Sequence, residues 1–185
     1  GDGQRALAAA ERMMPFGGKF AINGDIHAAL ALELLGRPAD ARARINAVLN
    51  RAPDETLALH HHGRLLAAAG YALHGAAVLV RTLSCNDPEI VERSMYELVG
   101  IANGYDLTAD AFVCAIAQAC AFLAQGARTT ALRKLDEATP HARYPAHVGA
   151  LRFLRSYAFR AAATRTGMDD AIAPVLSIHR ATPRT

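Results

Sequence analysis

Glycine recurs at an interval of 34 residues in this chain, at Gly36, Gly70 and Gly104. Between these glycines the apolar residues follow the period of an amphipathic α-helix rather than the alternation of a β-strand. Two helices joined by a short turn fill such an interval, and glycine commonly ends a helix because it accepts a positive φ. The spacing therefore predicts helical hairpins repeated along the chain, which must stack to bury their apolar faces.

The composition indicates an all-α fold. Hydrophobic residues make up 52% of the 185 residues, but only 6% are aromatic and there is no tryptophan. A chain rich in alanine and poor in aromatic residues packs helices closely and forms sheets poorly. We expect helices at residues 3–14, 25–35, 38–51, 55–69, 73–84, 88–102, 107–125, 127–138, 146–165 and 168–180. We also expect side-chain caps from Asp54, from Asp87, and from Thr108 with Asp110.

The hairpins carry a second pattern besides the glycines. In the first, Ala41 and Ile45 lie four residues apart and Pro53 follows the helix; in the second, Gly75 and Leu79 lie four residues apart before Pro88. Over residues 22–88 the chain resembles the tetratricopeptide-repeat family, and over 89–183 it shares only a similar architecture. The resemblance implies a right-handed α-solenoid of stacked antiparallel hairpins.

We expect a single helical-repeat domain over residues 1–185. It would comprise an N-terminal helix and an irregular loop at 1–24, two repeat units at 25–88, and divergent hairpins at 89–183. Because the chain begins with Gly1 rather than methionine, we expect it to be excised from a longer protein.

In tetratricopeptide domains the first helix of each unit lines a concave groove. The resemblance therefore implies that the polar residues of these helices bind a peptide, a partner or fused domain, or a second copy. The candidates are His27, Glu33, His60, His61, Arg64, Arg93, Tyr96 and Glu97. Because His60 and Arg64 are four residues apart, they share one helix face. An arginine there can bind a carboxylate with two hydrogen bonds, which suits an acidic peptide.

No pattern of residues predicts catalysis, a cofactor or a metal ion. The side chains of His60, His61 and His62 point about 100° apart on a helix, and no metal-binding residue lies four positions away. We expect one of them to pack between helices instead. The sequence also lacks a G-x-S-x-G motif and any arrangement of serine, histidine and acid around a nucleophile. We therefore expect an interaction module rather than an enzyme.

Charge and cysteine content limit which partners and which cellular compartment we expect. The net charge of +3 is too weak a field to favour nucleic acid. The longest uncharged run, residues 111–127, is shorter than a membrane span requires. An odd number of cysteines without a C-x-x-C pair indicates a reducing compartment, so we expect a soluble cytoplasmic protein.

Two other functions remain open. The first is a small-molecule or catalytic site built from the irregular loops at 15–24 and 140–146. A pocket enclosing at least two of His27, His141 and His147 would favour it. The second is RNA binding by a helical repeat, which would require a continuous basic face.

Overall fold

The computed structural model describes residues 1–160, and within them every regular element is a helix. The α-class prediction is therefore confirmed for this part of the chain. The predicted helix at 168–180, and the end of the one at 146–165, lie outside the described residues. The elements in order are α1 (Asp2–Glu11), the short 3-10 helix η1 (Met14–Phe16), α2 (Gly18–Leu34), α3 (Pro38–Arg51), α4 (Thr56–Ala68), α5 (Ala72–Thr82), α6 (Pro88–Gly104), α7 (Ala111–Ala124), α8 (Arg128–Ala138) and η2 (Thr139–His141). Residues 145–160 are also helical.

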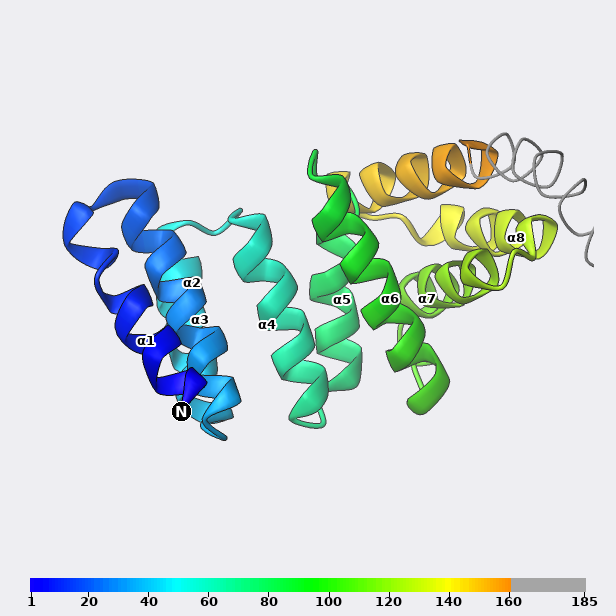
Figure 1. Cartoon of the computed structure of the whole chain (residues 1–185). Helices are drawn as coiled ribbons and strands as arrows, with labels where there is room; N and C mark the ends of the chain where they lie inside the picture. The colour runs from blue at the N-terminus through cyan, green and yellow to red at the C-terminus, as the bar shows by residue number, and fades with distance from the viewer. Residues whose placement is uncertain (161–185) are drawn as a thin grey trace, which may run out of the picture.

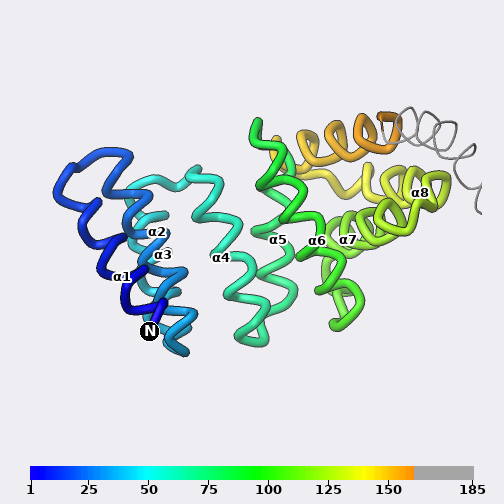
Figure 2. Tube along the Cα trace, in the orientation of Figure 1, coloured from blue at the N-terminus to red at the C-terminus, as the bar shows by residue number. Residues whose placement is uncertain are grey.

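The helices follow one another in chain order along the long dimension of the molecule (Figure 1). Each packs on the next, and in addition α4 contacts α6 while α5 contacts α7. The trace in Figure 2 shows α4, α5 and α6 side by side at the centre, with α1 to α3 at one end and α7, α8 and residues 145–160 at the other. Neighbours in sequence are therefore neighbours in space.

Glycines end several helices in the predicted way. Gly36, Gly70 and Gly126 all have positive φ, between 73° and 91°, and follow the ends of α2, α4 and α7. Gly104 differs, because it is the last residue of α6 and lies within the helix. The 34-residue interval thus marks two equivalent turns, and its third glycine ends a helix without turning the chain through positive φ.

Two of the predicted caps are confirmed. The Asp87 side chain accepts hydrogen bonds from the backbone amides at the start of α6, and Asp110 does the same for α7. Two predictions were wrong. Glu55, not Asp54, is the residue before α4, and its side chain makes no capping bond. Thr108 lies in the turn before Asp110 and caps nothing.

The irregular loop expected at 15–24 is largely helical. Helices α1 and α2 are separated by Arg12 and Met13, by η1 and by Gly17, which has a φ of 70°, and α2 begins at Gly18. Gly24 lies where the two helices approach each other, since a Cβ atom on it would lie 2.9 Å from the carbonyl oxygen of Ala10. This glycine therefore allows close helix packing instead of forming a loop.

The interior divides into two hydrophobic clusters. The N-terminal cluster comprises buried residues of α2, α3 and α4: Ile26, Ala29, Leu32, Ala41, Ile45, Val48, Ala58 and Leu65. The C-terminal cluster is larger and runs from Ala67 on α4 through α5, α6, α7 and α8 to Leu154. Helix α4 contributes to both clusters, so it is the element that joins the two regions.

Helices α4 and α5 make a close contact through paired glycines. A Cβ atom on Gly75 would lie 2.5 Å from the carbonyl oxygen of Gly63 and 2.9 Å from the backbone nitrogen of Ala67. Only glycine at both positions leaves room for the two backbones to meet, which fixes how α4 presents its other face to α2 and α6.

Candidate functional site

Helices α2, α4 and α6 carry a cluster of polar side chains where they meet. Arg64 on α4 donates hydrogen bonds from both terminal nitrogens to the two carboxylate oxygens of Glu33 on α2. This bonding lowers the pKa of Glu33 below its ordinary value, so the carboxylate is ionised at neutral pH. Both side chains are half-buried. The carboxylate that Arg64 binds here is thus one from its own chain.

The predicted binding residues His60 and His61 lie inside the molecule. Only 4% of His60 and 6% of His61 is exposed, which confirms that at least one histidine of the run packs between helices and places both away from an open surface. Nδ1 of His60 lies 2.9 Å from the hydroxyl oxygen of Ser94 on α6. Burial lowers the pKa of His60 to about 4 and that of His61 to about 3, so both rings are neutral at pH 7. Among residues 1–160, the Nδ1 atom of His61 finds no hydrogen-bond partner.

The remaining candidates divide into those near this cluster and those outside it. The hydrogen bonds to Glu33 raise the pKa of Arg64, and the nearby charge of Glu97 adds to this effect. Arg93 lies near His60, although its side chain pairs with Glu89 on the same helix. His27 is exposed on α2. Tyr96 lines a small hollow on the other side of α6, together with Met95 and Tyr157. The structure therefore brings together Glu33, His60, His61, Arg64, Arg93 and Glu97, but not His27 or Tyr96.

A hollow of about 340 Å³ lies beside this cluster, between α4 and α6. Its floor consists of small residues, including Ala67, Ala68 and Gly100, and Tyr105 stands half-exposed at its end. Its lining is Arg64, Ala67, Ala68, Glu97, Gly100, Ile101 and Tyr105. The sequence reasoning identified Arg64 and Glu97 but missed the rest.

The 34-residue interval between the glycines could have located some of the missed residues. His60 and Ser94 are separated by the same 34 residues, as are Ala67 and Ile101. Equivalent positions of stacked repeats face each other across the interface between units. Aligning residues by this interval would have paired His60 with Ser94 and placed the floor of the hollow.

A second hollow, of about 320 Å³, lies beside the loop between α8 and the helical residues 145–160. The His147 ring stacks on Phe112 with ring centroids 3.9 Å apart, and Tyr144 meets it edge-on at 4.9 Å. The backbone N–H of Arg143 donates to Nδ1 of His147 over 3.3 Å, and burial lowers the pKa of His147. The proton of the neutral ring is therefore on Nε2. His141 lines the same hollow.

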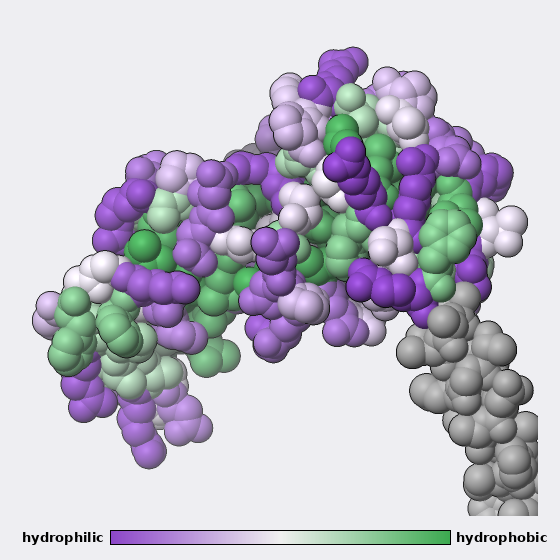
Figure 3. Space-filling model, turned by 90° about the horizontal axis from the view of Figure 1, so that it is seen from above, coloured by the Kyte–Doolittle hydropathy of each residue, from purple (hydrophilic) through white to green (hydrophobic). Residues whose placement is uncertain are grey.

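The hydrophobic surface is divided into patches. Figure 3 shows hydrophobic residues of the upper face between hydrophilic ones. At the α1–α2 end, Phe16 and Phe20 are 78% and 61% exposed, with ring centroids 6.3 Å apart. Within residues 1–160, no helix has the length and apolar character to cross a membrane, and no group of three or more histidine, cysteine, aspartate or glutamate side chains could hold a metal ion. All three cysteines are unpaired.

The comparisons with known proteins identify no relative. None of the family models, curated proteins and solved structures compared with this chain matches it. The functional argument therefore depends on the hollows, charges and contacts of the chain itself.

Proposed function

We propose that this chain is a protein-interaction module, in which tetratricopeptide-like hairpins stack into a right-handed α-solenoid and a partner segment binds across α4 and α6. The observation that carries the proposal is the hollow between these helices, with its floor of small residues and with Arg64, Glu97 and Tyr105 around it. Contacts between α4 and α6, and between α5 and α7, support stacking of equivalent helices. Three unpaired cysteines support a reducing compartment such as the cytoplasm.

The partner is a peptide or an extended segment of a protein. Small side chains on the floor leave room for a backbone or an apolar side chain, and a tyrosine supplies an aromatic contact surface of the kind enriched at interfaces. Arg64 is engaged by Glu33, so an acidic partner would bind only by displacing that carboxylate. Glu97 forms no ion pair within residues 1–160, and it can accept hydrogen bonds from a lysine or arginine of the partner. We therefore favour a basic segment over the acidic one that the sequence suggested.

Photo-crosslinking at Gly100, which lines the hollow between α4 and α6, tests this proposal. A crosslinking amino acid at Gly100 enters open space, because a Cβ atom there meets nothing within 4 Å. We expect capture of a partner from native lysate by this variant and not by one with the same group at Ala47, which is exposed on α3. Peptides from the captured protein would then be titrated against the purified chain.

Charge variants on α6 make the test specific. Glu97→Lys should weaken binding of the captured peptide about tenfold, because it replaces attraction by repulsion in the groove. Glu89→Lys is the matched control, since Glu89 lies on the exposed surface two turns earlier and does not line the hollow. Equal effects of the two substitutions would contradict binding of the peptide in the hollow between α4 and α6. Tighter binding by Glu97→Lys would indicate an acidic partner instead.

Small-molecule binding at the histidine loop is a second candidate, favoured because His141 and His147 line one hollow. His27, the third histidine considered, lies apart on α2. Arg143 and Tyr144 add polar groups to the lining. Inorganic phosphate and acetate, titrated while the His147 ring signals are followed by NMR, test this candidate. Unchanged His147 signals in the presence of either anion would count against it. The ion pairs that engage many arginines along the described chain give RNA binding no comparable support.

A further inference from the structure

The connection between α1 and α2 exposes two phenylalanines at the end of the molecule. Phe16 is 78% and Phe20 61% exposed, and their ring centroids lie 6.3 Å apart, so the two rings form one apolar patch. Figure 1 shows the connection at the outer edge of the row of helices, and Figure 3 shows hydrophobic residues at the same end between hydrophilic ones. Neither ring lines any of the hollows described above. An apolar patch rimmed by polar residues is typical of a contact site for a protein or a membrane.

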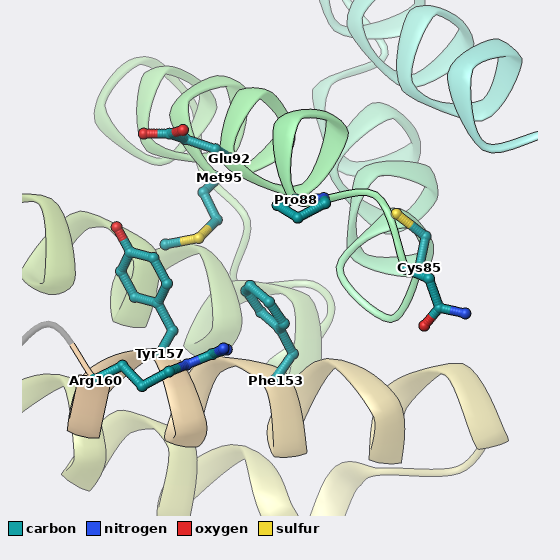
Figure 4. Close-up of a pocket in the computed structure, with 8 residues that line it drawn as sticks. Cys85, Pro88, Glu92, Met95, Phe153, Tyr157 and Arg160 are labelled. Atoms are coloured by element: carbon teal, nitrogen blue, oxygen red, sulfur yellow. The ribbon is translucent and has the colours of Figure 1, made fainter.

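A second aromatic pair in the described chain lies in a different setting. Phe153 and Tyr157 have ring centroids 6.0 Å apart and belong to the last described helix. Met95 extends toward them from α6 across a hollow of about 440 Å³ (Figure 4). Both rings are half-buried, because they pack against the C-terminal hydrophobic cluster. No described helix covers the phenylalanines of the α1–α2 connection to that degree, so their apolar surface is available to a partner.

The opposite side of this connection is held in place, which keeps the two rings facing outward. Met14, inside η1, lies against α2, since a Cβ atom on Gly24 would be 3.4 Å from its Cγ atom. Nη1 of Arg44 on α3 donates a hydrogen bond to the sulfur of Met14 over 3.6 Å. Gly17, with a φ of 70°, then turns the chain into α2. The patch is therefore arranged before any partner arrives, and binding requires little further ordering of the chain.

The charges left unpaired around this patch are positive. Arg12 follows α1 and Lys19 lies in the first turn of α2; both are exposed, and neither forms an ion pair within the described chain. The nearby carboxylates of Glu11 and Asp25 are bound by arginines of α3. Long cationic side chains extend past an apolar surface to reach anionic groups beside it. A partner that combines an apolar interior with negative charges therefore complements this end of the molecule.

We propose that this connection docks on an anionic membrane surface, with the rings of Phe16 and Phe20 among the acyl chains and with Arg12 and Lys19 at the lipid phosphates. A stable interface with another protein buries about 800 Å² on each partner, whereas two phenylalanine side chains exposed to this degree offer roughly 300 Å². A lipid surface needs no complementary shape, because its head groups and chains close around a small protruding patch. Aromatic residues beside lysine or arginine are typical of proteins that bind such surfaces, and each cation adds to the attraction of anionic lipids. None of these four residues lines the hollow between α4 and α6, so the two sites are separate.

A single tryptophan can report insertion, because the chain has none of its own. The full chain carrying Phe16→Trp would be mixed with vesicles of equal parts phosphatidylcholine and phosphatidylserine, with and without bromine on the acyl chains. We expect the fluorescence to shift to shorter wavelength and to be quenched by the brominated lipid. Phe159→Trp is the matched control, because Phe159 is 62% exposed on the last described helix and should show neither change. Unchanged fluorescence of Phe16→Trp, or equal quenching of both variants, would overturn the proposal.

Vesicle sedimentation separates the apolar contribution from the electrostatic one. Phe20→Ser should weaken binding at least about tenfold through lost apolar burial, and Lys19→Gln about fivefold through one lost cation. Vesicles of phosphatidylcholine alone should bind weakly, and added salt should release the chain. Arg152→Gln, on an exposed face of the last described helix, should leave binding unchanged.

Equal binding to the two kinds of vesicle, or binding that survives Phe20→Ser, would contradict the membrane contact. Analytical ultracentrifugation without lipid tests the other occupant. Self-association that Phe20→Ser abolishes, in a chain that binds no vesicles, would assign the patch to a second copy and overturn the proposal.

Discussion

The two ends of this molecule are built from the same kind of helix but are held together differently. In the C-terminal region an unbroken hydrophobic cluster runs from α4 through α8 to Leu154. In the N-terminal region a smaller cluster fills the space between α2, α3 and α4, and ion pairs surround it. Asp25 on α2, for example, binds both Arg44 and Arg51 of α3. Ion pairs of this partly exposed kind contribute little free energy compared with buried hydrocarbon.

The difference is sharpest where the two regions meet at α4. The side of α4 facing the N-terminal region carries the Arg64–Glu33 pair and the neighbouring His61. The side facing α5 is closed by glycines and apolar residues. We therefore expect α1 to α3 to separate from the rest more easily than any later pair of helices separates. The comparison suggests that a row of similar helices can contain one region that resists opening and another that opens easily, depending on what lies between neighbouring helices.

A buried charge in the N-terminal cluster should have the largest effect. Ala41 on α3 is fully buried, so Ala41→Glu places a carboxylate where it has no partner. We expect a loss of about 3–5 kcal/mol in the free energy of unfolding. Hydrogen exchange should show the amides of α1 to α3 losing protection while those of α5 to α7 retain it. Ala47→Glu, on the exposed face of α3, should change stability by about 0.5 kcal/mol at most.

An unchanged melting temperature for Ala41→Glu would mean that α3 does not bury this face. Uniform loss of protection along the chain would mean that the two regions unfold as one unit. Either result removes the proposed difference between them.

Acid should weaken the junction at α4 next most strongly. Burial lowers the pKa of His61 in the folded chain to about 3, against an ordinary value of 6.5. Between these two values the unfolded chain binds the proton and the folded chain does not, so stability falls as pH falls through this range. Above pH 7 both states are neutral and His61 has no effect. The loss should reach about 2 kcal/mol near pH 5, measured by urea unfolding at several pH values.

Replacing the ring tests this origin of the acid sensitivity. His61→Phe keeps the shape, removes the unpartnered Nδ1 atom and should flatten the fall in stability below pH 6.5, with His60 accounting for what remains. His74→Phe is the control, because His74 is exposed on α5. If the stability of the His61→Phe variant falls with decreasing pH as steeply as that of the unchanged chain, the acid-sensitive group is not His61.

Two glycines should respond to the same substitution in opposite directions. Gly75→Ala forces a methyl group against the Gly63 carbonyl and should cost about 1–2 kcal/mol. Gly100→Ala meets open space on α6 and should stabilise by about 0.5–1 kcal/mol through helix propensity. Thermal unfolding of the two variants compares them directly. If Gly75→Ala leaves the stability unchanged, α4 and α5 can move apart. The C-terminal region would then not be the more rigidly packed of the two.

Loss of the junction ion pair should have the smallest effect. Glu33→Gln removes the carboxylate that binds Arg64 with two hydrogen bonds, and should cost about 1 kcal/mol because the pair is half-buried. Glu89→Gln breaks an exposed pair within α6 and should cost about 0.3–0.5 kcal/mol. Unfolding at low and high salt separates the two, since high salt screens the exposed pair more completely. Equal losses of stability in the two variants would indicate that the paired hydrogen bonds between Arg64 and Glu33 contribute no more than the exposed ion pair does.

The sequence predicted helices well wherever local signals marked both ends. The bounds of α3 were predicted correctly because Pro38 begins it and the Ala52–Pro53 step cannot continue it. The start of α2 was missed by seven residues, since Gly17, Gly18 and Gly24 read as a loop. What keeps Gly24 helical is its contact with Ala10 on α1, and a contact between helices leaves no mark in the local sequence.

The candidate site shows the same division between local and tertiary information. The resemblance to tetratricopeptide repeats made Glu33, Arg64 and Glu97 candidates on three different helices, and the structure places these side chains near one another. Periodicity did not show that Arg64 is already bound by Glu33, because two residues 31 positions apart meet only through the packing of α4 on α2. The predicted binding role also required His60 to be accessible, although Ser94 on α6 provides a buried partner.

The pairing of each helix with its neighbours in sequence also governs how the chain folds. Contacts between consecutive helices close short loops, and chains rich in such contacts fold fast. During synthesis, α4 and α5 can form their glycine contact as soon as residues 56–82 have left the ribosome, before α7 and α8 exist. The chain can therefore acquire its structure progressively from its N-terminus, with each finished hairpin serving as the template for the next.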